Sequence, residues 1–250
     1  MTQTRVIPRL RYLATGVGLA CASLNLAQAE DQPEDKTAWK SSASAGVTLT
    51  RGNSETLLFH ADATTEKKWS MNELSFGING TYGENDGTKN AESFGAFGQY
   101  NRLFSERLLG YFRADGLHDA VADVEYRVAL SPGVGYYFVK SDRLQIRGEV
   151  GPGVVFEKLG STESAYYTMR FAENLQYKIN DRARLWQSIE FLPKVDKFSN
   201  YVLNSEIGVE TDITKRLSLR VFAQDTYRSD PAPGRKQTDL KLVAGVGYKF

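Results

Sequence analysis

The C-terminal stretch, residues 237–250, reads QTDLKLVAGVGYKF and carries the clearest pattern in the chain. Apolar and polar side chains alternate along it with a period of two, which is the period of a β-strand. One face is mostly apolar and holds Leu240, Leu242, Ala244, Val246, Tyr248 and Phe250. The other face holds Gln237, Asp239, Lys241, Val243, Gly245, Gly247 and Lys249. The stretch therefore predicts a strand with one apolar and one polar face.

The same alternation continues back through the chain to Trp39 in twelve segments. They centre near residues 45, 60, 78, 97, 112, 131, 150, 172, 187, 206, 221 and 244. Short polar turns are expected near residues 68, 105, 141, 181 and 214. Longer or Gly/Pro-rich connections are expected near residues 86, 120, 161, 196 and 233, with residues 51–54 as a shorter member of that set. This arrangement indicates an all-β chain of antiparallel hairpins.

Two architectures fit such strands: a soluble barrel or sandwich, and a membrane barrel with apolar residues facing lipid. Segments of about 10 to 14 residues can cross a bilayer at a tilt. The strand number is even, aromatic residues lie at strand ends, and charges continue through strand middles on the polar face. We therefore predict a closed antiparallel transmembrane β-barrel of about 12 strands, with short periplasmic turns and moderate extracellular loops.

The N-terminal segment has the order of a secretory signal peptide. Arg5, Arg9 and Arg11 precede an apolar stretch over residues 12–26, and Ala27-Gln28-Ala29 follows it. We predict a signal peptide over 1–29, a flexible polar segment over 30–38 and the barrel domain over 39–250. A membrane anchor is the first alternative, although the apolar run is short for a span. A lipoprotein site at Cys21 is the second, although no leucine stands three positions before it.

Composition limits the remaining functions. The 250 residues include 31 basic and 30 acidic residues and 12% aromatic residues, too many aromatics for a collagen-like or disordered chain. This balance gives no basic excess, so we expect no nucleic-acid partner. Cleavage after Ala29 would take three of the basic residues and Cys21, the only cysteine. The mature protein would then carry a slight negative charge and no thiol chemistry.

The chain ends in a phenylalanine preceded by apolar residues at alternate positions. Leu242, Val246, Tyr248 and Phe250 resemble the C-terminal signal of outer-membrane proteins, which the barrel-assembly machinery reads. An ordinary last strand that ends in phenylalanine is the alternative. We predict a bacterial outer-membrane location, with outer-membrane lipid and the barrel-assembly machinery as partners.

Three short motifs occur in a familiar order: Arg51-Gly52-Asn53-Ser54, Gly151-Pro152-Gly153-Val154 and Leu203-Asn204-Ser205-Glu206. They resemble the salt-induced outer-membrane protein family of Gram-negative bacteria, whose members carry a domain of unknown function. The resemblance covers most of residues 39–250. It implies an outer-membrane barrel without an established activity, and it implies neither catalytic residues nor a substrate.

The two histidines do not form a recognisable catalytic motif. Outer-membrane lipid hydrolases place Ser two positions after His, but Asp62 follows His60 and Ala120 follows His118. A triad assembled from distant strands remains an alternative. His60 and Asp62 lack further ligands for a metal, and the chain has no nucleotide motif. We therefore predict no catalytic residue, no metal site and no cofactor.

Charged residues of both signs fall on the polar face and are expected inside the barrel. The predicted lumen charges are Asp62, Arg127, Arg147, Glu149, Arg170, Glu206 and Arg220. Further inward charges are expected at Glu66, Glu73, Asp115, Glu125, Glu190, Glu210, Arg113, Arg184 and Lys241. Pairs across neighbouring strands would stiffen the wall. A solute pathway of weak selectivity is the functional alternative.

Size favours a narrow lumen. Twelve strands about 4.8 Å apart at a tilt of about 40° give a backbone diameter of roughly 24 Å and a lumen of about 10 Å. Inward aromatic residues narrow it further: Phe97, Tyr111, Tyr137, Trp186 and Phe222. We favour a narrow channel for small solutes or ions, or an envelope-structural barrel. A lipid-modifying hydrolase is the alternative, and short outer loops argue against a receptor or adhesin.

Glu173 conflicts with this arrangement. It falls on the apolar face between Phe171 and Leu175, near the middle of its strand. A carboxylate facing lipid there is unfavourable. A partner subunit, a protonated carboxyl or a wrong strand assignment would each explain it.

Overall fold

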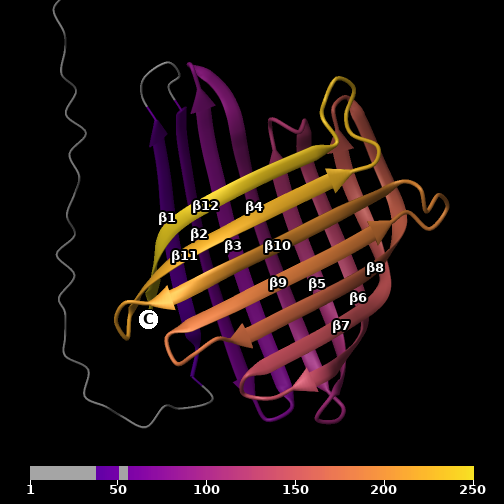
Figure 1. Cartoon of the computed structure of the whole chain (residues 1–250). Coiled ribbons are helices and arrows are strands. Elements are labelled where there is room, and N and C mark those ends of the chain that lie inside the picture. Colours follow the sequence, from indigo (N-terminus) through magenta and orange to yellow (C-terminus); the bar gives the residue numbers. More distant parts are fainter. Residues whose placement is uncertain (1–37, 51–55) are drawn as a thin grey trace, which may run out of the picture. The chain divides into compact units, whose positions relative to one another are not determined.

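The computed structural model describes residues 38–50 and 56–250, which form a closed barrel of antiparallel strands (Figure 1). The strands are β1 Lys40–Thr50, β2 Thr56–Trp69, β3 Asn72–Asn85, β4 Thr88–Leu103, β5 Leu108–Asp119, β6 Val124–Lys140, β7 Leu144–Leu159, β8 Thr162–Lys178, β9 Ala183–Pro193, β10 Tyr201–Asp212, β11 Leu217–Arg228 and β12 Thr238–Lys249. Each strand pairs with its neighbours in sequence, and β1 pairs with β12. The predicted barrel of about 12 strands is confirmed.

Some predictions concern residues outside these ranges. The expected signal peptide over 1–29, most of the polar segment over 30–38 and the Arg51–Ser54 motif lie outside the described residues. Within the described part of the chain, no helix is long and apolar enough to cross a membrane.

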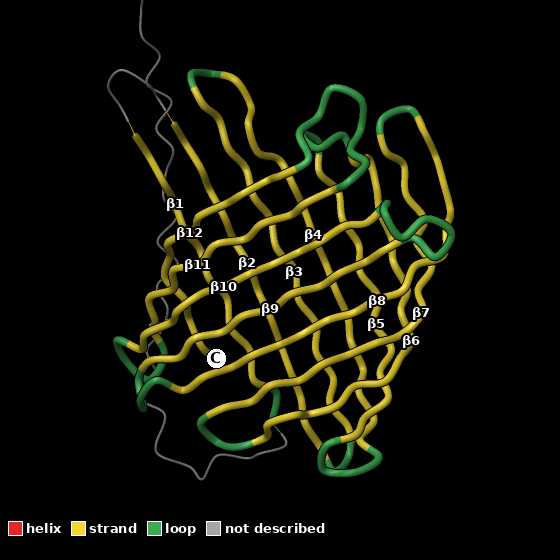
Figure 2. The backbone as a smooth tube through the Cα atoms, turned by 45° about the vertical axis from the view of Figure 1, so that its right-hand side comes forward, coloured by secondary structure: helices red, strands yellow, loops and turns green. Residues whose placement is uncertain are grey.

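The connections lie at two ends of the barrel, as Figure 2 shows. The turn end holds residues 70–71, 104–107, 141–143, 179–182 and 213–216, together with Lys40 and Phe250. The loop end holds residues 86–87, 120–123, 160–161, 194–200 and 229–237. These two names are used below for the two ends.

Apolar residues cover the outside of the wall and polar residues line the inside. On the outer face of β12, Leu240 is 72% exposed and Leu242 is 67% exposed. On the inner faces, Glu149 and Arg170 are almost completely buried. A soluble barrel would have the opposite distribution, whereas a barrel that faces lipid requires this one.

Aromatic rings run across the outer wall near both ends. Towards the loop end, ring centroids are 6.2 Å apart for Phe171 and Phe191 and 5.1 Å apart for Phe191 and Tyr201. Tyr201 and Tyr227 continue this row at 5.6 Å. At the turn end, Tyr248 packs against Phe250 at 5.0 Å. Such rows are typical of the two interfaces of a membrane barrel.

Two loop-end connections are tight turns that contain glycine. The prediction of longer or Gly/Pro-rich connections near residues 86 and 161 is confirmed in its glycine form, because β3–β4 and β7–β8 continue to two-residue turns that hold Gly87 and Gly160. Asp86 and Gly87 have φ of 48° and 72°, and Gly160 has φ of 58°. Left-handed turn residues match the twist of paired strands, so the hairpins close tightly there.

A β-bulge changes which residues face inward at the start of β6. The register of β6 against β7 shifts between Val124 and Tyr126. Val124, expected on the outer face, is instead fully buried. The predicted inward position of Glu125 is wrong, because its side chain is 59% exposed and lies 2.5 Å from Lys158. One extra residue in a strand reverses the alternation, which explains both errors.

The seam that closes the barrel is short. β1 and β12 pair over only four positions, from Ser42 with Lys249 to Ala45 with Val246. The backbones approach closely here, since a Cβ at Gly46 would lie 2.5 Å from the carbonyl oxygen of Ala244. Beyond this point the two strands diverge towards the loop end (Figure 2).

Candidate functional site

Three cavities lie inside the barrel and share lining residues. The largest, of about 480 Å³, lies towards the loop end, and one of about 120 Å³ lies nearer the turn end. Asn174 lines both of these cavities. A third, of about 240 Å³, opens among the turns and shares Gln145 and Gln176 with the second. The three cavities therefore follow one another along the inner face of β8, through Asn174 and Gln176.

A network of buried charges lies beside this row. Arg170 on β8 bonds to Glu149 on β7 at 2.7 Å and to Glu190 on β9 at 2.6 Å. Arg147 lies 2.9 Å from Glu149, which also accepts a hydrogen bond of 2.9 Å from Gln99. Each charge has an opposite charge at contact distance, which is the condition for burying ions without a large penalty.

The network reaches around much of the wall. Arg113 bonds to Asp115 at 2.6 Å and donates to Gln99 at 3.1 Å. At its other edge, Asn204 on β10 donates to Glu190 at 3.1 Å. Together with the bond between Gln99 on β4 and Glu149 on β7, these contacts link the strands from β4 to β10 and brace the cross-section of the barrel.

Aromatic rings fill the lumen beside the network. Leu109, Tyr111 and Tyr137 form a buried cluster. The guanidinium of Arg170 lies 5.2 Å from the ring of Tyr111, and that of Arg147 lies 5.6 Å from the ring of Tyr137. These rings narrow the lumen, as expected from their inward positions.

A second charged group lies near β1 and β12. The Nη1 of Arg220 donates to the two oxygens of Asp62 at 3.2 Å and 3.0 Å. Its guanidinium lies 5.1 Å from the ring of Trp186. Glu206 accepts from Trp186 at 2.5 Å and from Gln224 at 2.6 Å.

The structure places the seven predicted lumen charges on inner strand faces but does not bring all of them together. Arg147, Glu149 and Arg170 share the first network. Asp62 and Arg220 form the second group. Arg127 lies apart at the loop end, 3.5 Å from Glu157. The lumen thus has separate charged groups and not one continuous charged ring.

The histidines do not assemble a hydrolytic site. Ser44 donates to Asp62, while the Nδ1 of His60 lies 2.9 Å from the hydroxyl of Thr81. Asp62 therefore lies between Ser44 and His60, so this serine does not contact the histidine as the nucleophile of a Ser-His-Asp triad must. His118 lies on the surface, and its Nδ1 bonds to the backbone oxygen of Glu125 at 2.8 Å.

Metal ligands are also scattered. Within residues 38–50 and 56–250, no group of three or more His, Cys, Asp or Glu side chains could hold a metal ion. The donor set around His60 is hydroxyl and carboxylate groups already bonded to one another.

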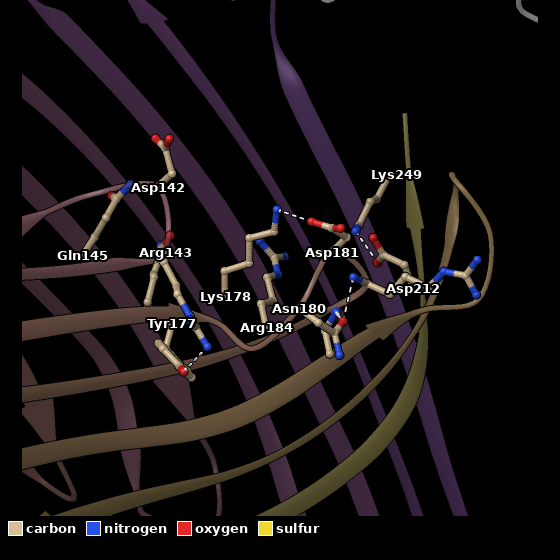
Figure 3. Close-up of a pocket in the computed structure, with 13 residues that line it drawn as sticks. Asp142, Arg143, Gln145, Tyr177, Lys178, Asn180, Asp181, Arg184, Asp212 and Lys249 are labelled. Atoms are coloured by element: carbon tan, nitrogen blue, oxygen red, sulfur yellow. Dashed lines mark hydrogen bonds and ion pairs between the residues drawn. The ribbon is translucent and has the colours of Figure 1, made fainter.

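The cavity among the turns is edged by paired charges, as Figure 3 shows. Lys178 lies 2.7 Å from Asp181, and Lys249 lies 2.5 Å from Asp212. The hydrogen bond from Lys178 lowers the pKa of Asp181 below its usual value. Arg143 donates to the hydroxyl of Tyr177 at 3.1 Å. The lining of this mouth holds five basic and three acidic residues, so it presents both charges with a basic excess.

The predicted assembly-signal residues lie on the outer wall at the end of β12. Val246 is 49% exposed, Phe250 is 75% exposed, and the backbone N–H of Phe250 bonds to Ser41 at 3.0 Å. Their apolar side chains are thus available at the surface beside the seam. Recognition by the assembly machinery stays a prediction.

Asn174 and Arg228 are among the lumen residues that were not predicted. Asn174 joins two cavities, and Arg228 lines the largest one. The alternation could have found Arg228, because it lies an even number of positions after Arg220 on the same strand. Asn174 carries no charge, so the sequence pattern did not single it out. Its position between two cavities follows only from the shape of the lumen.

Comparison with known proteins gives similar chains over the full length. The chain is 24% identical to the "Uncharacterized protein YdiY" of Escherichia coli (strain K12) over 261 residues, which covers 100% of both chains. Its fold is similar to the NanC porin, with a TM-score of 0.53, 9% identity, and coverage of 84% of this chain and 100% of that chain. A KdgM porin in complex with disordered oligogalacturonate matches with a TM-score of 0.49 and 9% identity, over 85% and 99% of the two chains.

A family model matches residues 43–250, which is nearly the whole of the barrel. It is described as "Protein of unknown function, DUF481". This match agrees with the resemblance of the short motifs to a family with a domain of unknown function, while the link to salt induction stays a prediction. The chain belongs to the DUF481 family.

Proposed function

We propose that the protein is an outer-membrane barrel that serves as a narrow channel for small solutes or ions. The observation that supports this most directly is the series of three cavities along the inner face of β8. A barrel built only for support could fill its lumen with side chains. Here the cavities continue from the loop end to the turns, with Asn174 and Gln176 between them.

The lumen chemistry favours small polar solutes. Along the path, β8 presents the small Ala172 and the neutral amides of Asn174 and Gln176, and these amides can exchange hydrogen bonds with a passing solute. The charges of the Arg170 network beside the path are already paired. Paired charges give weak selectivity, because their fields largely cancel at a distance.

The cellular setting is part of the proposal. An apolar outer wall needs lipid around it, and a leader cleaved after Ala29 would bring the chain to the envelope. The C-terminal Phe250 would then direct insertion by the barrel-assembly machinery. We propose the bacterial outer membrane as the location on these grounds.

Ion currents across planar bilayers test the channel. Folded mature protein is expected to give discrete current steps. Asn174→Trp is expected to reduce the conductance at least fivefold, because a bulky ring would close the narrow passage between two cavities. Val221→Trp, on the outer wall, is the matched control and is expected to leave the conductance unchanged.

An envelope-structural role is the second candidate, and the network around Arg170 favours it. It braces strands β3 to β10, and such bracing resists deformation whether or not solute passes. Absence of current steps from correctly folded protein would reject the channel and leave this role.

A further inference from the structure

We infer that the largest cavity binds the oxyanion group of a small solute, a carboxylate or a phosphate, between Arg127 and Arg228. Both residues line the cavity, one from β6 and the other from β11. The inference rests on the proposed function for its setting, because the cavity is the loop-side part of the proposed channel.

The two guanidinium groups are buried and incompletely bonded. Arg127 is 7% exposed and Arg228 is 6% exposed. The Nη2 of Arg127 and the Nε of Arg228 are enclosed and have no hydrogen-bond partner in the described chain. Buried donors normally have a partner, so two such donors at one cavity indicate a missing acceptor.

Two other enclosed arginine nitrogens in the lumen differ from these donors, because each of them faces a carboxylate. The Nε of Arg147 and the Nε of Arg220 also lack a hydrogen bond of good geometry. However, each faces a carboxylate, Glu149 at 2.9 Å and Glu210 at 3.8 Å. Arg228 has no carboxylate within 4.0 Å anywhere in the described ranges, so its charge lacks a direct counterpart.

The acceptors nearest these arginines are already occupied. Glu157 lies 3.5 Å from Arg127 and also accepts the hydroxyl of Tyr166 at 2.8 Å. Asp119 accepts the backbone N–H groups of Val121 and Ala122 at 3.1 Å and 2.9 Å. Asp239 lines the same cavity, with Lys241 on the same inner face of β12. Of the two guanidinium groups, only that of Arg127 has a directly paired carboxylate, Glu157.

An oxyanion would satisfy both open donors. Guanidinium groups bind carboxylate and phosphate oxygens through charge-assisted hydrogen bonds. A cavity of about 480 Å³ has room for a small organic anion. The two arginines come from different strands and carry the same charge. An anion between them would therefore also reduce the electrostatic repulsion between their guanidinium groups.

Equilibrium dialysis of the folded mature barrel in a non-ionic detergent tests the site, with radiolabelled inorganic phosphate in one arm and radiolabelled acetate in the other. At least one of the two anions is expected to bind the unaltered protein. Arg228→Gln is expected to weaken that binding at least tenfold. Arg235→Gln removes the same charge from an exposed position in the β11–β12 loop and is expected to change the affinity less than twofold.

Heat-dependent gel mobility shows whether each variant folds. If Arg228→Gln does not fold, Arg228→Lys replaces it in the binding experiment, because lysine keeps the charge but lacks the Nε–H. It is expected to weaken binding about threefold. Equal binding by folded Arg228 variants and the unaltered protein, or no binding of either anion, would overturn the inference. Binding is measured without conduction, so a barrel that binds at Arg228 but passes no current rejects only the channel.

Discussion

Arg170 and Glu173 lie on the same strand, β8, and face opposite sides of the wall. Arg170 faces the lumen, is 3% exposed and has two carboxylates within 2.7 Å. Glu173 faces outward, paired with Gly148 and Ile189, and its Oε2 is enclosed without a hydrogen-bond partner. The inner face supplies partners for a buried charge, and the outer face does not.

A second carboxylate on the outer wall also has an enclosed oxygen without a hydrogen-bond partner. The register connects Glu173 to Ile189, Ile189 to Ser205, and Ser205 to Asp225. The Oδ1 of Asp225 is also enclosed and without a hydrogen-bond partner. Enclosed, unbonded carboxylate oxygens therefore lie on the outside, whereas enclosed, unbonded arginine nitrogens lie in the lumen. The predictions below test this difference between the two faces, beginning with the largest effect.

Removal of the central lumen cation is expected to destabilise the barrel most. Arg170→Leu should lower the free energy of unfolding by about 3–5 kcal/mol, because Glu149 and Glu190 would stay buried without their partner. Urea titration in lipid vesicles, followed by tryptophan fluorescence, measures the effect. Arg143→Leu, in an exposed turn, is the control, and a loss below about 1 kcal/mol for Arg170→Leu would contradict the prediction.

The close approach of β6 and β7 beside Arg170 depends on a glycine. Gly151 pairs with Arg170, and a Cβ there would collide with the backbone oxygen of Pro132. Gly151→Ala is therefore expected to cost about 1–3 kcal/mol in the same titration. Gly116→Ala adds the same methyl group where nothing lies within 4 Å, and it should be close to neutral. Equal effects of the two variants would show that the wall adapts at Gly151.

On the outer face, removal of a charged side chain is expected to raise the free energy of unfolding instead of lowering it. Glu173→Leu should stabilise the barrel by about 1–2 kcal/mol, because it removes a carboxyl group from a surface that faces lipid. Asp225→Leu should act in the same direction. Unfolding in vesicles measures both changes. If Glu173→Leu instead lowers stability and converts an oligomer to monomers on a native gel, a second copy of the chain covers this surface.

The smallest effect is expected for a charge pair at the exposed end of the wall. Lys158 lies 2.5 Å from Glu125, and the two side chains are 35% and 59% exposed. Lys158→Ala should leave the free energy of unfolding nearly unchanged, since water screens exposed pairs. A loss comparable to that of Arg170→Leu would show that exposure does not decide the value of these pairs.

Alternation predicted most of the fold, because in a barrel the position of a side chain follows from its parity along the strand. It assigned Glu173 to the outer face, where the structure has it. It failed at Val124 and Glu125, because the extra residue of a bulge leaves no mark in the hydropathy pattern. At residues 86 and 161 it left open whether the connections are long or glycine-rich, because it could not foresee that the strands would continue to two-residue turns.

Partners inside the lumen were beyond the reach of the sequence. Parity places Gln99, Glu149 and Arg170 inside, but it does not say which of them meet. The contact of Gln99 on β4 with Glu149 on β7 depends on the diameter of the barrel and on rotamers. The candidate anion site has the same origin, because it depends on which donors remain unbonded after all other contacts form.

The four-position seam between β1 and β12 also has a consequence for the order of folding. It joins Ser42 to Lys249, the longest separation along the chain of any strand pair, whereas every other pair joins neighbours in sequence. Closing so long a loop has the largest entropic cost. We therefore expect the hairpins to form first and the ring to close last, so that a chain truncated before β12 would stay an open sheet. Time-resolved crosslinking between cysteines placed in β1 and β12 would follow that final step.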